Sequence, residues 1–76
     1  MVSSAQIRMA RAALGLSVRV LADRAKVAES TIHRFESNKG GMQANTLDKL
    51  QLVLEEQGVL FIPADTSGGP GVRLKS

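Results

Sequence analysis

The stretch VLADRAKVAESTIHRFE, residues 20–36, decides the fold of this chain. Its apolar residues recur three or four positions apart in two separate runs, and this spacing places each run on one face of a short α-helix. The first run is Leu21, Ala22 and Ala25, the second is Ile32 and Phe35, and Val27 lies between them. So short a stretch leaves room only for a tight turn between the two helices.

Two short helices joined by a tight turn form a helix-turn-helix arrangement, in which the first helix braces the second and the second is offered to a groove of DNA. The flanks extend the stretch to LGLSVRVLADRAKVAESTIHRFESNK. This run resembles the core of the Cro/C1 (XRE-like) transcription regulators, whose usual form is LGLSQ..LA..AGVS..TI.R.E.G. The matching residues keep one unbroken register: Leu14, Gly15, Leu16, Ser17, Leu21, Ala22, Ala25, Val27, Thr31, Ile32, Arg34 and Glu36.

The resemblance covers Ile7 to Gly58 and points to a shorter bacterial branch of that family, in which an apolar strand follows the fourth helix. It implies a mainly α fold: a four-helix, lambda repressor-like helix-turn-helix domain with a short C-terminal β-strand or β-hairpin. We expect the DNA-binding domain over residues 1–58 and a β extension over residues 59–76, packed on the same domain and used for dimerisation.

The composition fits one small DNA-binding domain. The 76 residues make a single domain near the lower size limit for folding on one hydrophobic core. The absence of cysteine excludes disulfides and thiolate metal sites. Ten Lys and Arg against seven Asp and Glu give a net charge of +3, which favours an acidic polymer such as DNA without identifying one.

Several classes of protein are disfavoured. No apolar run approaches the ~20 residues of a membrane span, and the first residues carry no signal segment, so we expect a cytoplasmic protein without a membrane partner. The chain has one histidine and no HExxH or phosphate-loop glycine signature. We therefore expect no enzyme, no catalytic residue, no cofactor and no multi-histidine metal site.

Local signals set the expected ends of the first two helices. Ser3 and Gln6 form a capping-box pattern, which predicts a helix from about residue 4, and Gly15 is a natural left-handed stop. Ser17 should cap the second helix, which runs to about Ala25.

The turn departs from the family pattern at two positions. Lys26 replaces the customary glycine, and a positive φ there would cost lysine ~1 kcal/mol. Ala28 replaces the usual serine cap of the third helix, which should cost a further ~1 kcal/mol.

The resemblance implies a structural ion pair between Arg11 and Glu36. The family pairs an arginine at the first position with the glutamate that closes the recognition helix. Arg11 could instead be an ordinary solvated charge, but we favour the pair, which would hold the first helix against the third.

The recognition helix is expected over about residues 28–37. The resemblance implies that Glu29, Ser30 and Arg34 read bases, with Thr31 and His33 nearer the DNA backbone. Arg34 can donate to guanine O6 and N7 together, and Glu29 can accept from cytosine N4.

Plainer interpretations of these residues stay open. Glu29 could serve only the helix dipole, Ser30 could be plain solvent surface and Arg34 a solvated charge, although the register favours DNA contact for Arg34. His33 is better explained as a surface or phosphate-contacting imidazole than as a pH switch.

Backbone contacts to DNA are expected on both sides of the recognition helix. Ser17 and Lys26 flank the second helix, and Asn38 and Lys39 lie in a polar loop with two glycines, where family members touch phosphates. An ordinary connecting loop is the alternative for that segment.

The last third of the chain should contain a fourth helix and two strands. Asn45 is the expected N-cap, with Asp48 in the first turn, and Gly58 the expected end. The core stripe of this helix is Leu47, Leu50, Val53 and Leu54. The run VLFI at residues 59–62, stopped by Pro63, predicts a strand buried on both faces.

The apolar strand suggests a second subunit, because a two-stranded ribbon alone is marginal in water. We expect a homodimer through this sheet; a tail folded back over its own core and a disordered end are the alternatives. The expected interface residues are Val59, Leu60, Phe61, Ile62, Val72 and Leu74.

The leading functional hypothesis is a transcriptional regulator, most simply a repressor, that binds an inverted-repeat operator in double-stranded DNA as a homodimer. The alternative is an antitoxin-like protein-binding module, whose C-terminal apolar strand engages a partner protein.

Overall fold

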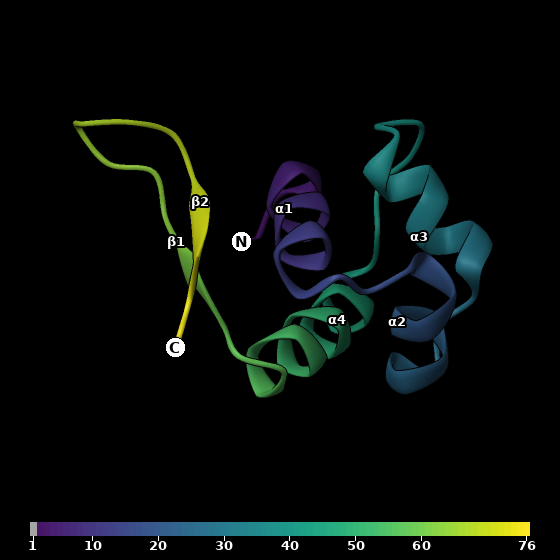
Figure 1. Cartoon of the computed structure of the whole chain (residues 1–76). Coiled ribbons are helices and arrows are strands. Elements are labelled where there is room, and N and C mark those ends of the chain that lie inside the picture. Colours follow the sequence, from purple (N-terminus) through teal and green to yellow (C-terminus); the bar gives the residue numbers. More distant parts are fainter. Residues whose placement is uncertain (1) are drawn as a thin grey trace.

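The computed structural model describes residues 2–76 and shows a helical domain that ends in a two-stranded antiparallel sheet. The elements are α1 (Ser4–Leu14), α2 (Val18–Ala25), α3 (Glu29–Glu36), α4 (Ala44–Glu56), β1 (Val59–Ile62) and β2 (Gly71–Leu74). Figure 1 shows α1 between the hairpin and α3, with α2 beside α3 and α4 passing beneath α1. The predicted mainly α fold with a C-terminal β-hairpin is confirmed.

The predicted caps begin and end the first two helices. The Gln6 backbone N–H donates to Ser3 Oγ at 3.2 Å and the Ser3 N–H donates to Gln6 Oε1 at 2.9 Å, which completes the capping box. Gly15 ends α1 with a φ of 68°, and Ser17 Oγ accepts from the Val20 N–H at 3.1 Å. These boundaries depend on residues a few positions apart, which is why the sequence predicts them well.

The turn between α2 and α3 contains both predicted irregularities. Lys26 closes α2 with a φ of 57°, in the left-handed region that disfavours side chains with a Cβ. Ala28 occupies the N-cap of α3 and makes no side-chain hydrogen bond. The first turn of α3 therefore lacks a side-chain acceptor at its N-cap.

The expected start of α4 is wrong by two residues. Gln43 is the N-cap and Asn45 lies inside the helix, while Asp48 falls beyond the first turn. The first helical bond runs from the Leu47 N–H to the Gln43 carbonyl at 3.0 Å. Burial of Leu47 with the following apolar stripe decides where this helix begins, because packing outweighs the preference of asparagine for a cap.

One core joins all four helices to the hairpin. Its fully buried large side chains are Ile7 from α1, Leu21 from α2, Ile32 from α3, Leu50 and Leu54 from α4, and Val59 from β1. Burying each such side chain stabilises the fold by ~1.5–3 kcal/mol. Since α3 contributes to this core from one face, its opposite face points outward.

The hairpin covers the core with one face only. Val59 is fully buried, and Phe61 and Val72 pack against the core from opposite strands. Leu60 and Ile62 alternate with them and remain 45% and 36% exposed. In the single chain α1 and α4 cover one face of the strand, and burial of the other face by a second subunit stays a prediction.

This arrangement bears on the expected dimer interface, which stays a prediction. Val59 has no side-chain surface left for a partner, and Phe61 and Val72 are half-buried in the chain's own core. The hairpin thus packs on its own domain, and the expected homodimer stays a prediction. Within residues 2–76, no helix is both long and apolar enough to cross a membrane.

Candidate nucleic-acid interface

Helix α3 is held by one face and exposed on the other. Ile32 is fully buried and Phe35 packs half-buried against the core. Ser30, His33 and Arg34 are exposed, as expected for helix positions on the side away from the buried stripe. The predicted base-reading residues therefore lie on the free side of α3, with Glu29 exposed in its first turn.

Thr31 lies at the margin of this surface. Its side chain is half-buried, between the inward stripe and the outer face of α3. A hydroxyl at such a margin is better placed to reach the side of a groove than its floor.

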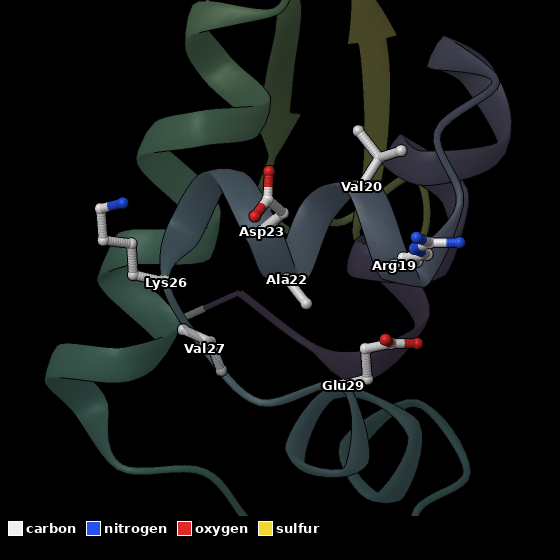
Figure 2. A pocket seen from close by; sticks show the side chains of 7 residues that line it. All are labelled: Arg19, Val20, Ala22, Asp23, Lys26, Val27 and Glu29. Carbon is white, nitrogen blue, oxygen red and sulfur yellow. The ribbon is translucent and has the colours of Figure 1, made fainter.

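A cavity of about 620 Å³ opens between α2 and the start of α3. Its lining residues are Arg19, Val20, Ala22, Asp23, Lys26, Val27 and Glu29. Figure 2 shows Arg19 and Glu29 on one side of this hollow and Lys26 on the other. The structure thus brings the predicted residues Lys26 and Glu29 to one surface and adds Arg19, which no sequence motif indicated.

The loop after α3 lies beside Arg34. Asn38 adopts a φ of 59°, and the Lys39 N–H donates to the Arg34 carbonyl at 2.9 Å, so the chain turns sharply at the end of the helix. A Cβ at Gly40 would lie only 3.4 Å from Arg34 Nη2. Arg34 and the predicted backbone-contact residues Asn38 and Lys39 therefore gather at one end of α3.

The expected ion pair between Arg11 and Glu36 is present. Arg11 donates through Nε to Glu36 Oε2 at 2.7 Å and through Nη2 to Glu36 Oε1 at 2.6 Å, a two-pronged arrangement. A third donor, Arg11 Nη1, reaches the Leu16 carbonyl at 3.0 Å. The Glu36 hydrogen bonds raise the pKa of Arg11 above its ordinary value, and the Glu36 side chain is only 8% exposed.

Two further contacts tie α1 to the end of α3. Arg8 Nη1 donates to the Glu36 carbonyl, and Ser4 Oγ donates to Asn38 Oδ1 at 2.7 Å. Arg8 lies one helical turn before Arg11, so its place on the same face was readable from spacing, whereas its partner was not. Contacts from α1 thus hold the C-terminal end of α3 in place.

Positive charge is concentrated in the helix-turn-helix half. Residues 2–43 contain seven Lys and Arg against three Asp and Glu, while residues 44–76 contain three against four. Because the field of a phosphate backbone attracts cations and repels carboxylates, this distribution favours approach to DNA by α1 to α3. Among residues 2–76, no three His, Asp or Glu side chains gather where they could hold a metal ion.

Two helices that pack on the core and are joined by a tight turn, the second with one face exposed, define the helix-turn-helix class of DNA-binding domains. The chain belongs to the helix-turn-helix domain family, whose model matches residues 4–53, from the start of α1 into α4. No curated protein matches the chain. Membership of this family indicates a DNA-binding regulator.

Proposed function

We propose that this protein is a sequence-specific transcriptional regulator of the Cro/C1 (XRE-like) type, most simply a repressor, that binds double-stranded DNA as a homodimer. The observation that carries this proposal is the placement of α3. Ile32 anchors the helix in the core while Ser30 and Arg34 face outward, so the helix can enter a major groove without unfolding any part of the domain.

Base reading is assigned to Glu29, Ser30 and Arg34. Arg34 donates to guanine O6 and N7 together, and Glu29 accepts from cytosine N4. A carboxylate near phosphates is repelled wherever no such donor is present, so Glu29 penalises wrong sequences more than it adds affinity. The presence of Arg19 and Lys26 around the same cavity as Glu29 softens that repulsion.

Contacts to the DNA backbone are assigned to residues on both sides of α3. Lys39 and Asn38 follow its C-terminal end, close to Arg34. Ser17 and Lys26 lie at the two ends of α2, and Thr31 and His33 lie on α3 itself. These residues fix orientation and carry no sequence information directly.

The homodimer is assigned to the outer side of the hairpin. Leu60 and Ile62 on this side stay 45% and 36% exposed. Leu74, which pairs with Val59 on the core-facing side, is 46% exposed at the end of β2. Each strand of the two-stranded sheet has only one neighbour among the described residues. Two subunits related by a two-fold axis would place two α3 helices in successive major grooves, ~34–36 Å apart, so the operator is an inverted repeat.

Selection from random-sequence DNA tests base reading. The unaltered protein should return a two-fold motif, and Arg34→Ala should relax one base pair of each half-site, because a two-pronged guanine contact contributes ~1–3 kcal/mol of discrimination. If the Arg34→Ala variant returned the same motif as the unaltered protein, the role given to Arg34 would be refuted.

Lys39→Ala is the matched comparison at the same end of α3. This change should weaken binding to all sequences alike and lower the salt slope by ~1, because it removes one phosphate contact. A changed base preference in the Lys39→Ala selection would contradict its assignment to the backbone.

One observation favours a second candidate, an antitoxin-like module that binds a partner protein. Leu60 and Ile62 form an exposed apolar pair on the outer face of β1, which a partner strand or groove could cover. The mass of the purified protein in solution separates the two: a stable dimer supports the regulator, whereas a monomer that aggregates through this face supports the partner-dependent module.

A further inference from the structure

Gln6 carries a hydrogen-bonding role that its helix cap does not require. Its side chain is almost fully buried, with the residue 3% exposed. The capping box uses only the amide oxygen, which accepts from the Ser3 N–H. The amide nitrogen donates to the Ile62 carbonyl and to the Gly71 carbonyl, each at 3.0 Å.

These two carbonyls belong to different strands. Ile62 ends β1, Gly71 begins β2, and the two residues pair across the ladder where the hairpin loop leaves the sheet. One buried amide group therefore holds both strands to α1. Its loss would leave two acceptors and a polar pocket without their donor, which is the costly way to break a buried hydrogen bond.

The opposite face of α1 holds the recognition helix. Ser4 and Arg11 bind Asn38 and Glu36 at the end of α3. On an α-helix, two positions correspond to a rotation of ~200°, so Gln6 points away from the face that carries Ser4. Figure 1 shows the resulting order in space, with α1 between the hairpin and α3.

We propose that Gln6 is a positioning residue that sets the spacing between the two half-sites of the operator. The inference rests on the proposed function, in which the hairpin joins two subunits and α3 reads DNA. In each subunit, the contacts that join α3 to the partner subunit then run from α3 to α1 and through the Gln6 amide to the hairpin. Gln6 touches no DNA and acts through the angle at which α1 meets the hairpin.

Spacing is a sensitive readout of this angle. One additional base pair between the half-sites moves the second half-site by ~3.4 Å along the axis and rotates it by ~34°. A hairpin held on α1 at two points cannot follow that displacement. Without these two hydrogen bonds the hairpin stays packed through Val59, Phe61 and Val72, but its angle to α1 is less fixed. It can then follow the displacement, and the protein accepts operators of neighbouring spacing.

The test measures binding of the full chain to inverted repeats that differ only in the spacer, using the half-site obtained by selection. For Gln6→Met, the ratio of affinities for the best spacing over spacings one base pair longer or shorter should fall by on the order of tenfold, the worth of roughly one hydrogen bond. Gln6→Glu gives a second variant of the same shape, which keeps an oxygen for Ser3 but places a carboxylate against the two carbonyls; its ratio should fall as well.

Gln51→Met is the matched control. Gln51 and Gln6 both line a second, smaller cavity of about 190 Å³. The Gln51 amide donates to Glu55 within α4 and not to the hairpin, so the spacing ratio should stay as in the unaltered protein. Because each ratio is measured on one preparation, a lower folded fraction weakens both affinities and leaves the ratio unchanged.

The outcomes separate the two proposals. Unchanged spacing profiles for both Gln6 variants would overturn the positioning role while leaving the regulator intact. An unaltered protein that prefers no inverted repeat at all would instead refute the homodimeric regulator itself. An equal fall for Gln51→Met would assign the effect to general loosening of the core and also overturn the inference.

Discussion

Removing Arg11 is predicted to leave a buried carboxylate without its partner. Glu36 is 8% exposed and receives two hydrogen bonds from Arg11, at 2.6 and 2.7 Å. In the variant Arg11→Met, an apolar side chain of similar length fills the space but donates nothing. The Leu16 carbonyl loses its hydrogen bond from Arg11 in the same change.

The expected loss follows from the burial of the two partners. Breaking a buried ion pair from one side costs ~3–5 kcal/mol, because the remaining charge is not compensated. The Arg11 side chain is 22% exposed, which lets water reach the pair and sets the expected loss near the lower end, at ~3 kcal/mol. A domain of 76 residues has ~4–11 kcal/mol of total stability, so Arg11→Met should remove between about a quarter and three quarters of it.

Two comparison variants isolate the pair. Glu36→Leu leaves the charge on Arg11, whose long side chain can reach solvent, so the expected loss is smaller, ~1–2 kcal/mol. The double variant Arg11→Met with Glu36→Leu removes both charges and should lie within ~1 kcal/mol of the unaltered protein, because apolar replacements for a buried pair are often neutral. The coupling between the sites would then be ~3–5 kcal/mol.

Urea unfolding followed by circular dichroism measures these free energies, provided that the transition is two-state with an unchanged slope. A loss below ~0.5 kcal/mol for Arg11→Met would show that the pair adds nothing beyond a typical exposed ion pair. Strict additivity in the double variant would show that the two side chains act independently. Either result would refute the reasoning from burial.

Two further predictions concern the turns. Lys26→Gly should raise the unfolding free energy by ~1 kcal/mol, because glycine adopts the φ of 57° without strain. The control Lys26→Ala removes the same charge but keeps the strain. An equal gain in unfolding free energy for Lys26→Ala would contradict this explanation. Hydrogen bonds from the Ser67 hydroxyl, the Ser67 amide and the Gly68 amide lower the pKa of Asp65 below its ordinary value of 3.8. Since the pKa of Asp65 is lower in the folded than in the unfolded protein, these hydrogen bonds stabilise the turn fully above pH 3.8 and are lost as the pH falls through the folded pKa. NMR titration of the Ser67 and Gly68 amides should give a midpoint below 3.8. A midpoint at or above 3.8 would disprove the effect.

Local rules predicted much of the helical part of the fold. The capping box of Ser3 and Gln6, the left-handed Gly15 and the Ser17 cap each involve residues at most three positions apart. The strained φ at Lys26 was likewise predicted from the sequence at the turn. Such features need no knowledge of the rest of the chain, because the interacting groups are already neighbours along the helix.

The ion pair between Arg11 and Glu36 came from another source. The two residues are 25 positions apart, and no local periodicity connects them. The resemblance to a known family supplied the pairing, and the structure contains it. The roles of Glu29, Ser30 and Arg34 in reading bases also come from that resemblance, and they stay predictions until DNA binding is measured.

What the sequence alone determined is the set of helices, their inward faces and the side of α3 that is free, since the spacing of apolar residues fixes these within each element. Only the tertiary structure decided that α4 begins after Gln43, that Leu60 and Ile62 remain uncovered, and that Gln6 reaches carbonyls 56 and 65 positions away. Those outcomes depend on which layers meet in space. The sequence pattern of a segment indicates which of its faces is buried and which is exposed. Which other helix or strand covers the buried face depends on the packing of the whole domain.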